Sequence, residues 1–360
     1  MLTWGDDYPI HQTPEPVAFA GTDRNFYDRY FFNGYTPDGS VFFAAALGVY
    51  PHLDVIDAAF CLLIDGVQHN IRASRRLNSE RMDLRVGPIE VKVVEPLKQL
   101  KVTVTGNDSG ITADLNFNAR HEPIEEPRFT RRQGPRMFMD YTRLTQNGRW
   151  SGVIKHGKRE IPIDPTQVRG TRDRSWGIRP VGAPESQPAP GAFQFFWLWT
   201  PCNFEDRALF FHTNDDDTGT PWNRRAVMDV FGQSRTEYEH PAPKLIYMSG
   251  TRRLASADIS LAPNGPLFRI TPTGANFYMN GLGYTHPTWG HGRDHGDLEI
   301  AYDTLVDTDD ALPGNLHIQA LAKATLEDRG RVIEGFGVLE QFIMGPHAPS
   351  GLTGVLDPAP

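Results

Sequence analysis

Cysteine is nearly absent from this chain of 360 residues, which has only Cys61 and Cys202. The two lie far apart in apolar stretches and no CxxC pair exists, so the sequence predicts two small buried thiols rather than a disulfide framework. Apolar runs are also short, and none approaches the roughly 20 residues that span a bilayer as a helix. The first residues, MLTWGDDYPIHQ, lack the basic start and apolar stretch of a signal peptide. We therefore expect a cytoplasmic protein with no integral membrane segment.

Basic charge is in deficit, with a formal net charge of −8 at pH 7. This balance argues against a general nucleic-acid binder and against docking on an acidic membrane surface. The common motifs of catalysis are missing too: the Gly-x-Ser-x-Gly elbow, the Walker loop, a Gly-x-Gly-x-x-Gly after a strand, and His-Glu-x-x-His. An ATP-dependent or hydride-transfer enzyme of a familiar kind is therefore not predicted. We expect a hydrophobic or aromatic small-molecule partner, and the sequence leaves a homodimer open.

What the chain does contain is short segments of alternating polarity. In ITADLNFNAR (111–120) every second residue is apolar, which is typical of a half-buried strand. Residues 315–327 alternate in the same way, whereas 41–50 and 192–200 are apolar on both faces and indicate central strands, although a short apolar run alone does not exclude a helix. Turn signals occur at Asp38-Gly39, Asp65-Gly66, Asn147-Gly148 and Asn264-Gly265.

Many short strands with frequent turns predict an all-β protein, and this length is too great for one barrel. The Pro-rich stretch VGAPESQPAPGA (181–192) is the best break in the chain. We therefore predict two antiparallel β-barrel or sandwich domains, residues 1–180 and 192–347. Residues 181–191 would form a linker, and 348–360 a tail.

The segment GTRDRSWGIRP (170–180) places an acid between two arginines. Asp173 is either a catalytic acid or half of an ordinary ion pair. Because successive residues of a strand point to opposite faces, Arg172 and Arg174 would share one face with Trp176 while Asp173 occupies the other. If Asp173 points into an apolar barrel, desolvation raises its pKa and suits it to general acid catalysis. We expect this orientation, with the arginines outward.

A second segment, YTHPTWGHGRDHG (284–296), holds three histidines among glycines that exclude a helix. His286 and His291 flank Trp289 and are candidates for acid–base or substrate-orienting roles. Three histidines also suit zinc, but His295 and the others would converge only in a folded loop. The alternative for all three is ordinary hydrogen bonding inside a tight loop.

Three acidic segments have plainer interpretations. NDDDTG (214–219) resembles a calcium loop but lacks the later glutamate, so a hairpin loop is predicted. EEPRFTRRQG (125–134) predicts a surface ion-pair network. Asp140, beside Tyr141 in an apolar strand, is either buried and paired or lines a cavity.

The Asp-x-x-Trp-Gly segment formed by Asp173, Trp176 and Gly177 resembles the signature of the carotenoid 1,2-hydratase/AttH superfamily, the hydroxyneurosporene synthase-like proteins. Further similar segments are YDRYFFNGYTPDGSVFFAAALGVYP (27–51), THPTWGHG (285–292) and GFGVLEQFIMGPH (335–347), the last two similar to an uncharacterised bacterial branch. The resemblance spans roughly residues 25–347.

This resemblance implies two lipocalin-like β domains with a hydrophobic ligand pocket, no organic cofactor, and a buried acid among aromatic walls. Protonating an alkene or an enol needs such an acid in a dry pocket with π faces near the developing cation. The resemblance implies Asp173 as the acid, with Trp176 beside it, and places His286, Trp289 and His291 in the second matching segment. The hypothesis built on it makes Asp173 the general acid/base and His286 or His291 its partner, and expects Tyr141, Trp176, Trp197 and Trp289 to line the pocket.

The leading hypothesis is a cofactor-independent lyase or isomerase, such as a hydratase or dehydratase, using a carboxylate acid/base. Its substrate would be a largely apolar molecule: a terpenoid, a steroid or a lignin-derived aromatic. One alternative is a non-catalytic lipocalin-like carrier of a hydrophobic ligand. A further alternative is a zinc enzyme centred on the His286–His295 loop, although no metal is expected under the leading hypothesis.

Overall fold

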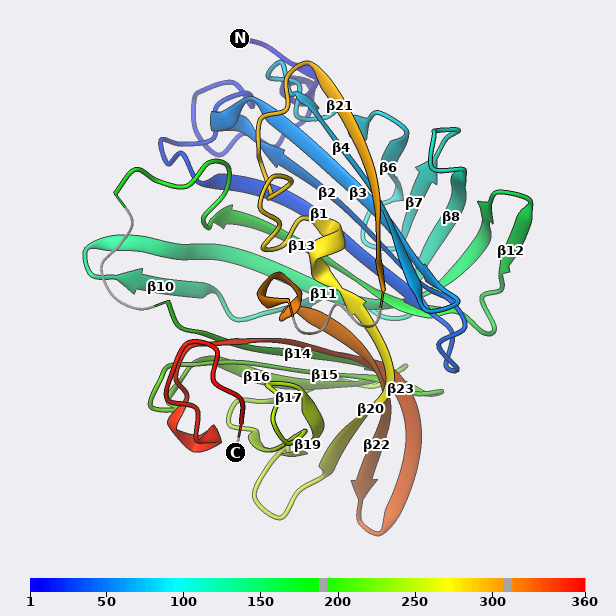
Figure 1. Cartoon of the computed structure of the whole chain (residues 1–360), viewed down its shortest axis with the longest axis vertical. Coiled ribbons are helices and arrows are strands. Elements are labelled where there is room, and N and C mark those ends of the chain that lie inside the picture. The colour runs from blue at the N-terminus through cyan, green and yellow to red at the C-terminus, as the bar shows by residue number, and fades with distance from the viewer. Residues whose placement is uncertain (188–192, 307–311, 360) are drawn as a thin grey trace. The chain divides into compact units, whose positions relative to one another are not determined.

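The computed structural model of the protein describes residues 1–187, 193–306 and 312–359 (Figure 1). These residues form antiparallel strands joined by turns and by short 3-10 helices, which confirms the predicted all-β class. The 3-10 helices are η1 (Trp4–Asp7), η2 (Pro51–Leu53), η3 (Met279–Leu282), η5 (Pro313–Asn315) and η6 (Ala348–Ser350). Within the described ranges, no helix has the length and apolarity needed to cross a membrane.

The chain divides into two compact units. Among the described residues, unit 1 comprises 1–35, 41–187 and 281–305, and unit 2 the remainder. This division differs from the predicted boundaries, which assigned 281–305 to the second domain. The segment belongs to unit 1 because its strand β21 (Leu298–Val306) extends the unit 1 sheet beside β4 (Val67–Arg76).

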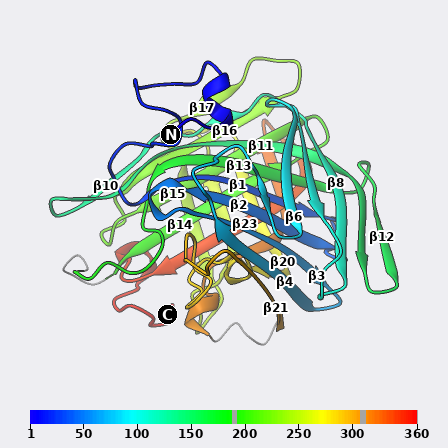
Figure 2. The same cartoon turned by 90° about the horizontal axis from the view of Figure 1, so that it is seen from above.

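Unit 1 is built on a sheet of 14 strands. The remaining strands are β1 (Phe26–Tyr35), β2 (Phe42–Tyr50), β3 (Val55–Ile64), β5 (Arg85–Val86), β6 (Ile89–Glu95), β7 (Gln99–Val104), β8 (Ile111–Ala119), β9 (Ile124–Glu125), β10 (Phe129–Gln133), β11 (Arg136–His156), β12 (Arg159–Ile163) and β13 (Arg169–Ile178). The main path runs β21-β4-β3-β2-β1-β13-β11-β8-β7-β6-β5. Because β5 also packs near β3 and β4, the sheet curls into a barrel, as Figures 1 and 2 show.

One face of this sheet forms an apolar core that includes Phe32, Phe43, Phe60 and Trp150. The strands predicted at 111–120 and 41–50 are both present, as β8 and β2. In β8 the apolar residues are buried at alternate positions, and every residue of β2 is buried. The period-two pattern therefore identified both the half-buried strand and the central strand.

The turn predicted at Asn147-Gly148 is wrong, because both residues lie inside the long strand β11. Gly148 pairs with Gly170 of β13. A Cβ on Gly148 would lie 2.3 Å from the Phe117 ring, and one on Gly170 would lie 2.5 Å from Nε1 of Trp150. These glycines are there because large core rings lie against the backbone, which is a packing requirement rather than a reversal of the chain.

Unit 2 contains a separate sheet of nine strands in the order β17-β16-β15-β14-β23-β22-β20-β19-β18. They are β14 (Phe195–Asn203), β15 (Arg207–Asp215), β16 (Pro221–Val230), β17 (Thr236–Tyr238), β18 (Ala242–Tyr247), β19 (Leu254–Ser260), β20 (Leu267–Tyr278), β22 (Ile318–Asp328) and β23 (Arg331–Met344). The predicted strands at 192–200 and 315–327 correspond to β14 and β22, although residue 192 lies outside the described residues. The segment 214–219 forms the β15–β16 hairpin connection, as predicted.

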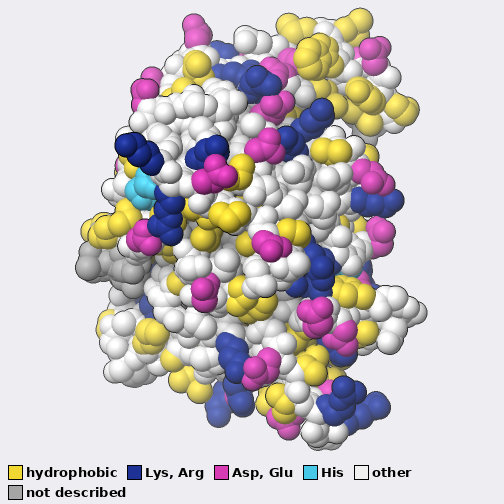
Figure 3. All heavy atoms as spheres, turned by 90° about the vertical axis from the view of Figure 1, so that its right-hand side faces the viewer, with side chains coloured by type: hydrophobic (Ala, Val, Ile, Leu, Met, Phe, Trp, Pro, Cys, Tyr) yellow, Lys and Arg dark blue, Asp and Glu magenta, His cyan; other side chains and the backbone are white. Residues whose placement is uncertain are grey.

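The two cysteines are buried and free, which confirms the prediction of isolated buried thiols. On the face shown in Figure 3, acidic and basic side chains are interspersed rather than gathered by sign.

Candidate active site

The face of the unit 1 sheet opposite the apolar core carries polar and aromatic side chains; we call it the polar face. Residues directly opposite on antiparallel strands project to the same side. Arg29 of β1 pairs with Gly48 of β2, which in turn pairs with Asp57 of β3. On the other flank of β1, Phe31 pairs with Asp173 of β13. Asp57, Arg29 and Asp173 therefore project from one face of the sheet.

Asp173 does not point into the apolar core, and the predicted orientation of this strand is wrong. Arg172 pairs with Phe32, and Arg174 pairs with Tyr30. Phe32 belongs to the apolar core, and Tyr30 packs against it. The two arginines thus stand on the core side of the sheet, and the acid stands on the other.

The core side accepts these arginines because each has a partner there. Nε of Arg172 donates to Oε1 of Gln146 at 2.8 Å. Arg174 forms an ion pair with Asp28, and its guanidinium lies 4.2 Å from the centre of the Tyr30 ring. Burial lowers the pKa of each arginine to about 10, so both remain charged at neutral pH.

Half-buried Asp173 sits in a second charged cluster on the polar face. Its charge raises the pKa of Tyr27 and of Arg143, which places it near both. Arg143 Nη2 donates to Oε2 of Glu126 at 2.7 Å, and the Thr145 hydroxyl donates to Oε1. Glu126 is 2% exposed, so it is a buried ion-pair partner rather than part of the predicted surface network.

Asp57 was not among the residues predicted from the sequence, although its surroundings favour the protonated carboxyl group. Its Oδ1 accepts a hydrogen bond from the Tyr50 hydroxyl at 3.1 Å, and its Oδ2 accepts one from the Gly292 backbone N–H at 2.7 Å. Burial raises the pKa of Asp57, and the charge of Arg29 opposes that rise only in part. A signal was available, because Asp57 is a lone acid within the apolar strand VIDAAFCLLI.

Gly48 makes this arrangement possible. A Cβ at this position would lie 2.3 Å from the Tyr50 hydroxyl and 3.0 Å from Oδ1 of Asp57. The Tyr50 hydroxyl therefore occupies the space that a side chain at position 48 would need. The glycine is required by this close approach, because the Tyr50 hydroxyl lies over position 48 and contacts Asp57 there.

His291 lies over the polar face and is held by two guanidinium groups. Arg29 Nη1 and Arg179 Nη2 each lie 3.1 Å from its Nδ1, and its Nε2 lies 3.1 Å from the carbonyl oxygen of Leu282. Guanidinium nitrogens only donate, so Nδ1 is the acceptor and Nε2 carries the proton. The ring is packed edge-on against Tyr284, with centroids 4.4 Å apart.

The other two histidines of this loop have separate surroundings. Nδ1 of His286 accepts hydrogen bonds from the backbone N–H groups of Trp289 and Thr288 at 2.9 and 3.2 Å, and burial lowers its pKa to about 4. His295 stacks on Trp289 with ring centroids 3.9 Å apart. Across the described part of the chain, no group of three His, Cys, Asp or Glu side chains is arranged to hold a metal ion.

The predicted aromatic residues are not all on the polar face. Tyr141 stacks on Phe129 at 4.5 Å and meets Tyr27 edge-on at 6.0 Å. Trp176, which pairs with Asp28 on the opposite side of the sheet from Asp173, is 38% exposed.

Trp197 belongs to unit 2, where it is part of a buried hydrogen-bonded cluster. Its Nε1 donates to Oε1 of Glu340 at 2.8 Å, and His317 Nε2 lies 2.8 Å from the same oxygen. Gln319 donates to Oε2 at 2.6 Å. Burial alone would raise the pKa of Glu340, but these partners lower it below its usual value.

Asp140 pairs with a neighbouring strand rather than with any site residue. Its Oδ1 accepts from Nε of Arg128 at 2.6 Å, and the carboxylate remains partly exposed. The sequence left open a buried, paired acid or one that lines a cavity; Asp140 is paired but partly exposed, and it does not line either of the cavities described below.

Two hollows lie in unit 1. A cavity of about 10 Å³, enough for one water molecule, is lined by Arg29, Asp57, Trp289 and His295 among others. A larger open groove of about 550 Å³ is lined by residues that include Ile71, Pro88, Asn107, Leu298, Ile300 and Tyr302. The small cavity joins the polar face to the histidine loop.

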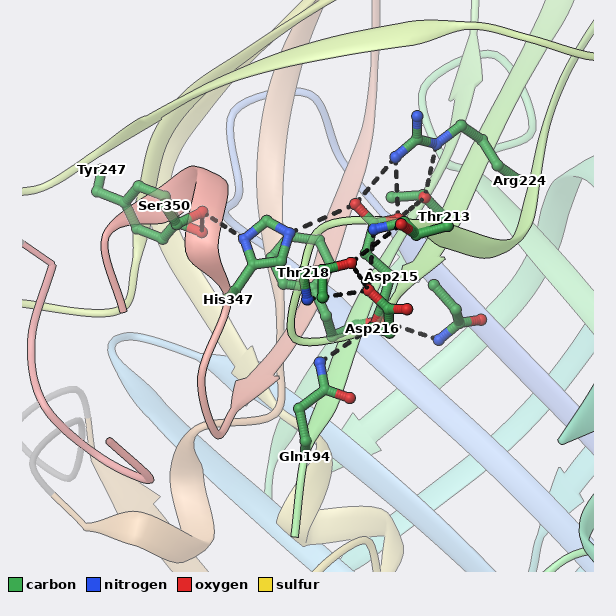
Figure 4. A network of polar contacts seen from close by, with 12 residues as sticks. Gln194, Thr213, Asp215, Asp216, Thr218, Arg224, Tyr247, His347 and Ser350 are labelled. Carbon is green, nitrogen blue, oxygen red and sulfur yellow. Dashed lines mark hydrogen bonds and ion pairs between the residues drawn. The ribbon is translucent and has the colours of Figure 1, made fainter. Parts of the chain in front are cut away.

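Unit 2 holds a second polar network, drawn in Figure 4. Ser350 Oγ lies 2.7 Å from Nδ1 of His347 and 2.8 Å from the Tyr247 hydroxyl, and His347 Nε2 lies 3.4 Å from Oδ2 of Asp215. Arg224 Nη2 donates to both oxygens of Asp215 at 2.9 Å.

This network resembles a Ser-His-Asp triad only in composition. Ser350 follows His347 by three residues in the same turn, and the backbone N–H groups of Ser350 and Gly351 already donate to His347 and Ala348. They are not available as an oxyanion hole. The network instead ties the C-terminal segment to the β15–β16 hairpin, where Ala348 N–H also donates to the carbonyl of Asp217.

A barrel and a second curled antiparallel sheet, with buried acids on the polar face of the barrel, define a two-unit, lipocalin-like β protein. The chain belongs to the family of unknown function DUF8625, whose model matches residues 2–353. No curated protein matches the sequence.

Three solved structures share the fold. A protein from Nitrosomonas europaea assigned as an AttH is 14% identical, with a TM-score of 0.55 over 93% of this chain and 98% of that one. Kievitone hydratase from Nectria haematococca is 10% identical, with a TM-score of 0.50 over 88% of each chain. CghA in complex with Sch210972 is 10% identical, with a TM-score of 0.52 over 89% of each. These similarities confirm the predicted AttH-like fold.

Proposed function

We propose that the protein is a cofactor-independent, hydratase-like enzyme that protonates a carbon–carbon double bond or an enol of a largely apolar small molecule, with Asp57 as the proton donor. The observation that carries the proposal is the environment of Asp57. The residue is half-buried, and its carboxyl group has a raised pKa and lies beside a cavity large enough for one water molecule. A carboxyl group whose pKa is raised by burial is better suited to act as a general acid.

Asp173 and Asp57 are too far apart to act on the same bond. They lie on β13 and β3, separated by β1 and β2. Three strand spacings of about 4.8 Å place their Cα atoms about 14 Å apart or more. Asp173 is close to the cation Arg143, whose pKa its charge raises. We therefore give Asp173 a role in orienting substrate and assign the proton transfer to Asp57.

The proposed reaction balances with one carboxyl group. Asp57 gives its proton to one carbon of the double bond, and a cation develops on the other. A water molecule adds to the cation and returns a proton to the Asp57 carboxylate. The product is the hydrated substrate, and the enzyme is restored.

His291 acts as a positioning residue in this scheme. Its Nδ1 accepts from two arginines, and its Nε2–H donates to the Leu282 carbonyl oxygen. Neither ring nitrogen is available to take a proton from water. His286 similarly uses Nδ1 within its own turn. Structural similarity to kievitone hydratase adds support for hydration as the reaction class.

The test is an assay for water addition. Purified protein is incubated with terpenoid alkenes, prenylated phenols and hydroxycinnamates in water labelled with heavy oxygen, and products are analysed by mass spectrometry. Wild-type protein should introduce one labelled oxygen into at least one substrate class. Asp57→Asn should reduce this rate by about 10²-fold or more, with ligand binding retained. Asp114→Asn, at an exposed pair with Lys101, is the matched control. Equal rates in wild type and Asp57→Asn would remove the proposal.

The larger groove supports a second candidate function, a carrier of a hydrophobic ligand. Leu298, Ile300 and Tyr302 are exposed beside it on β21. Native mass spectrometry of gently purified protein distinguishes the two. A carrier releases an unaltered apolar molecule on denaturation, and its binding is weakened by Ile300→Asp but not by Asp57→Asn.

A further inference from the structure

Two arginines on the polar face, Arg29, which is buried, and Arg179, which is half-buried, form no ion pair with a carboxylate of the described residues. Arg29 is 2% exposed, and its hydrogen bonds go to His291 Nδ1 and, at 3.4 Å, to the carbonyl oxygen of Leu282. Arg179 donates to the same His291 nitrogen. The Nε atom of each guanidinium is buried with no hydrogen-bond partner, and within residues 1–187, 193–306 and 312–359 neither forms an ion pair.

Two other buried arginines of unit 1 have a carboxylate partner. Arg72 pairs with Asp303, and Arg143 pairs with Glu126. A buried cation without a partner is costly, so evolved cores normally supply a counter-charge. Arg29 and Arg179 differ from Arg72 and Arg143 in this respect, which indicates that their counter-charge is not part of the protein.

The charge balance leaves an excess of positive charge near Arg29. Arg29 and Arg179 contribute two positive charges, and Asp57 is the acid whose pKa responds to both. The local charge is therefore +2 when Asp57 is protonated and +1 when it is ionised. Either value suits a ligand that carries a single negative charge.

The geometry brings the two cations to one point. One nitrogen of each guanidinium lies 3.1 Å from Nδ1 of His291. Aromatic faces flank them, because the Arg179 guanidinium lies 4.3 Å from the Tyr27 ring centre and the Arg29 guanidinium lies 4.9 Å from that of Tyr284. Paired guanidinium groups beside aromatic rings favour a planar carboxylate attached to an unsaturated or aromatic system.

We infer that the substrate carries a carboxylate, which docks on Arg29 and Arg179 so that its conjugated double bond lies toward Asp57. This inference rests on the proposed function for the role of Asp57, but the binding preference can be measured without turnover. His291 holds the two guanidinium groups together until the carboxylate binds. Neutral molecules of the same shape should bind less well, since they leave both cations buried and unpaired.

The experiment compares matched acid and amide ligands. Isothermal titration at low salt is carried out with trans-cinnamate and trans-cinnamamide, and with the benzoate and 4-phenylbutyrate pairs. Wild-type protein should bind at least one acid about tenfold or more tightly than its amide. Arg29→Gln and Arg179→Gln should each reduce that preference to about twofold or less. Arg29→Lys should retain most of it, because the charge remains.

Controls separate charge recognition from folding. Arg159→Gln, at an exposed pair with Asp65, should leave the preference unchanged. Thermal melting identifies any variant that fails to fold. If Arg29→Gln does not fold, the comparison relies on Arg179→Gln, because Arg179 is less buried. Equal affinity for acid and amide in wild type, no binding of any acid in the series, or a preference that survives both Gln variants would each overturn the inference.

The result also distinguishes this inference from the proposed function. Asp57-dependent hydration of neutral alkenes with no acid preference would refute carboxylate recognition alone. A clear acid preference with no Asp57-dependent hydration of any unsaturated acid would refute the proposed reaction and leave the binding site standing.

Discussion

Arg29 of β1 and Asp57 of β3 stand on either side of Gly48 in β2, and the Tyr50 hydroxyl fills the space that a side chain at position 48 would need. The glycine lets the Tyr50 hydroxyl reach Oδ1 of Asp57. Arg29, Asp57 and Tyr50 are thereby held at one place on the sheet. A methyl group at position 48 would disrupt this arrangement.

Gly48→Ala should displace Tyr50 and break its hydrogen bond to Asp57. The new Cβ would lie 2.3 Å from the rigidly attached Tyr50 hydroxyl, so the ring has to move. Overpacking of this kind costs about 1–3 kcal/mol. We expect a lower melting temperature and a loss of Asp57-dependent activity. Gly106→Ala, where an added Cβ meets nothing within 4 Å, should melt like wild type. An unchanged melting temperature and activity for Gly48→Ala would contradict the packing argument.

Glu126→Gln should destabilise unit 1 strongly, because it removes the negative charge of the buried carboxylate that pairs with the Arg143 guanidinium. Removing one partner of a buried pair costs about 3–5 kcal/mol. Urea unfolding followed by tryptophan fluorescence measures the change. Asp114→Asn removes an exposed partner of Lys101 and should cost at most about 1 kcal/mol. A similar loss of unfolding free energy in both variants would show that burial does not increase the contribution of the Arg143–Glu126 pair to stability.

Tyr50→Phe should move the high-pH limb of the activity profile to higher pH. The Tyr50 hydrogen bond favours the ionised form of Asp57, so its loss raises the pKa of that carboxyl further. The acid then stays protonated over a wider range. The pH dependence of kcat/KM for the best substrate checks this, with Tyr8→Phe at an exposed position as control. A limb that moves to lower pH would exclude Asp57 as the group that must be protonated.

Asp215 should contribute stability that is lost in acid. Burial raises the pKa of Asp215, but bonds from His347 and Thr213 and the pair with Arg224 together lower it below 3.8. The unfolded state therefore binds the proton more readily, so the contribution is present above the unfolded pKa and disappears as pH falls through the folded one.

Melting temperatures measured on either side of pH 4 test this assignment. Wild-type protein should lose stability more steeply below about pH 4 than Asp215→Asn, which should already be less stable at neutral pH. Asp164→Asn, at an exposed carboxylate that also has a lowered pKa, is the comparison for surface effects. Parallel curves for wild type and Asp215→Asn would place the acid sensitivity elsewhere.

The local sequence was enough to identify the strands, because alternation of polar and apolar residues has a period of two wherever one sheet face is buried. It found β8 and β22, and it recognised β2 and β14 from their continuous apolar runs. The family resemblance supplied the lipocalin-like, AttH-like fold. The histidine loop was also recognised as a functional candidate, and the structure brings its His291 to Arg29.

Tertiary structure alone decided which way those strands face and what they meet. Alternation shows that Asp173 and Arg172 lie on opposite faces, but only pairing with Phe31 and Phe32 shows that the arginine is on the core side. The same limit hid Asp57, whose acidity depends on burial and on a loop more than 200 residues away in the chain. The packing role of Gly148 could not be predicted from the sequence either. An Asn-Gly pair normally indicates a turn, whereas here the glycine lies in a strand because the Phe117 ring packs against its backbone. Short-range patterns record local geometry, whereas burial and charge compensation are properties of neighbours that the chain brings together only on folding.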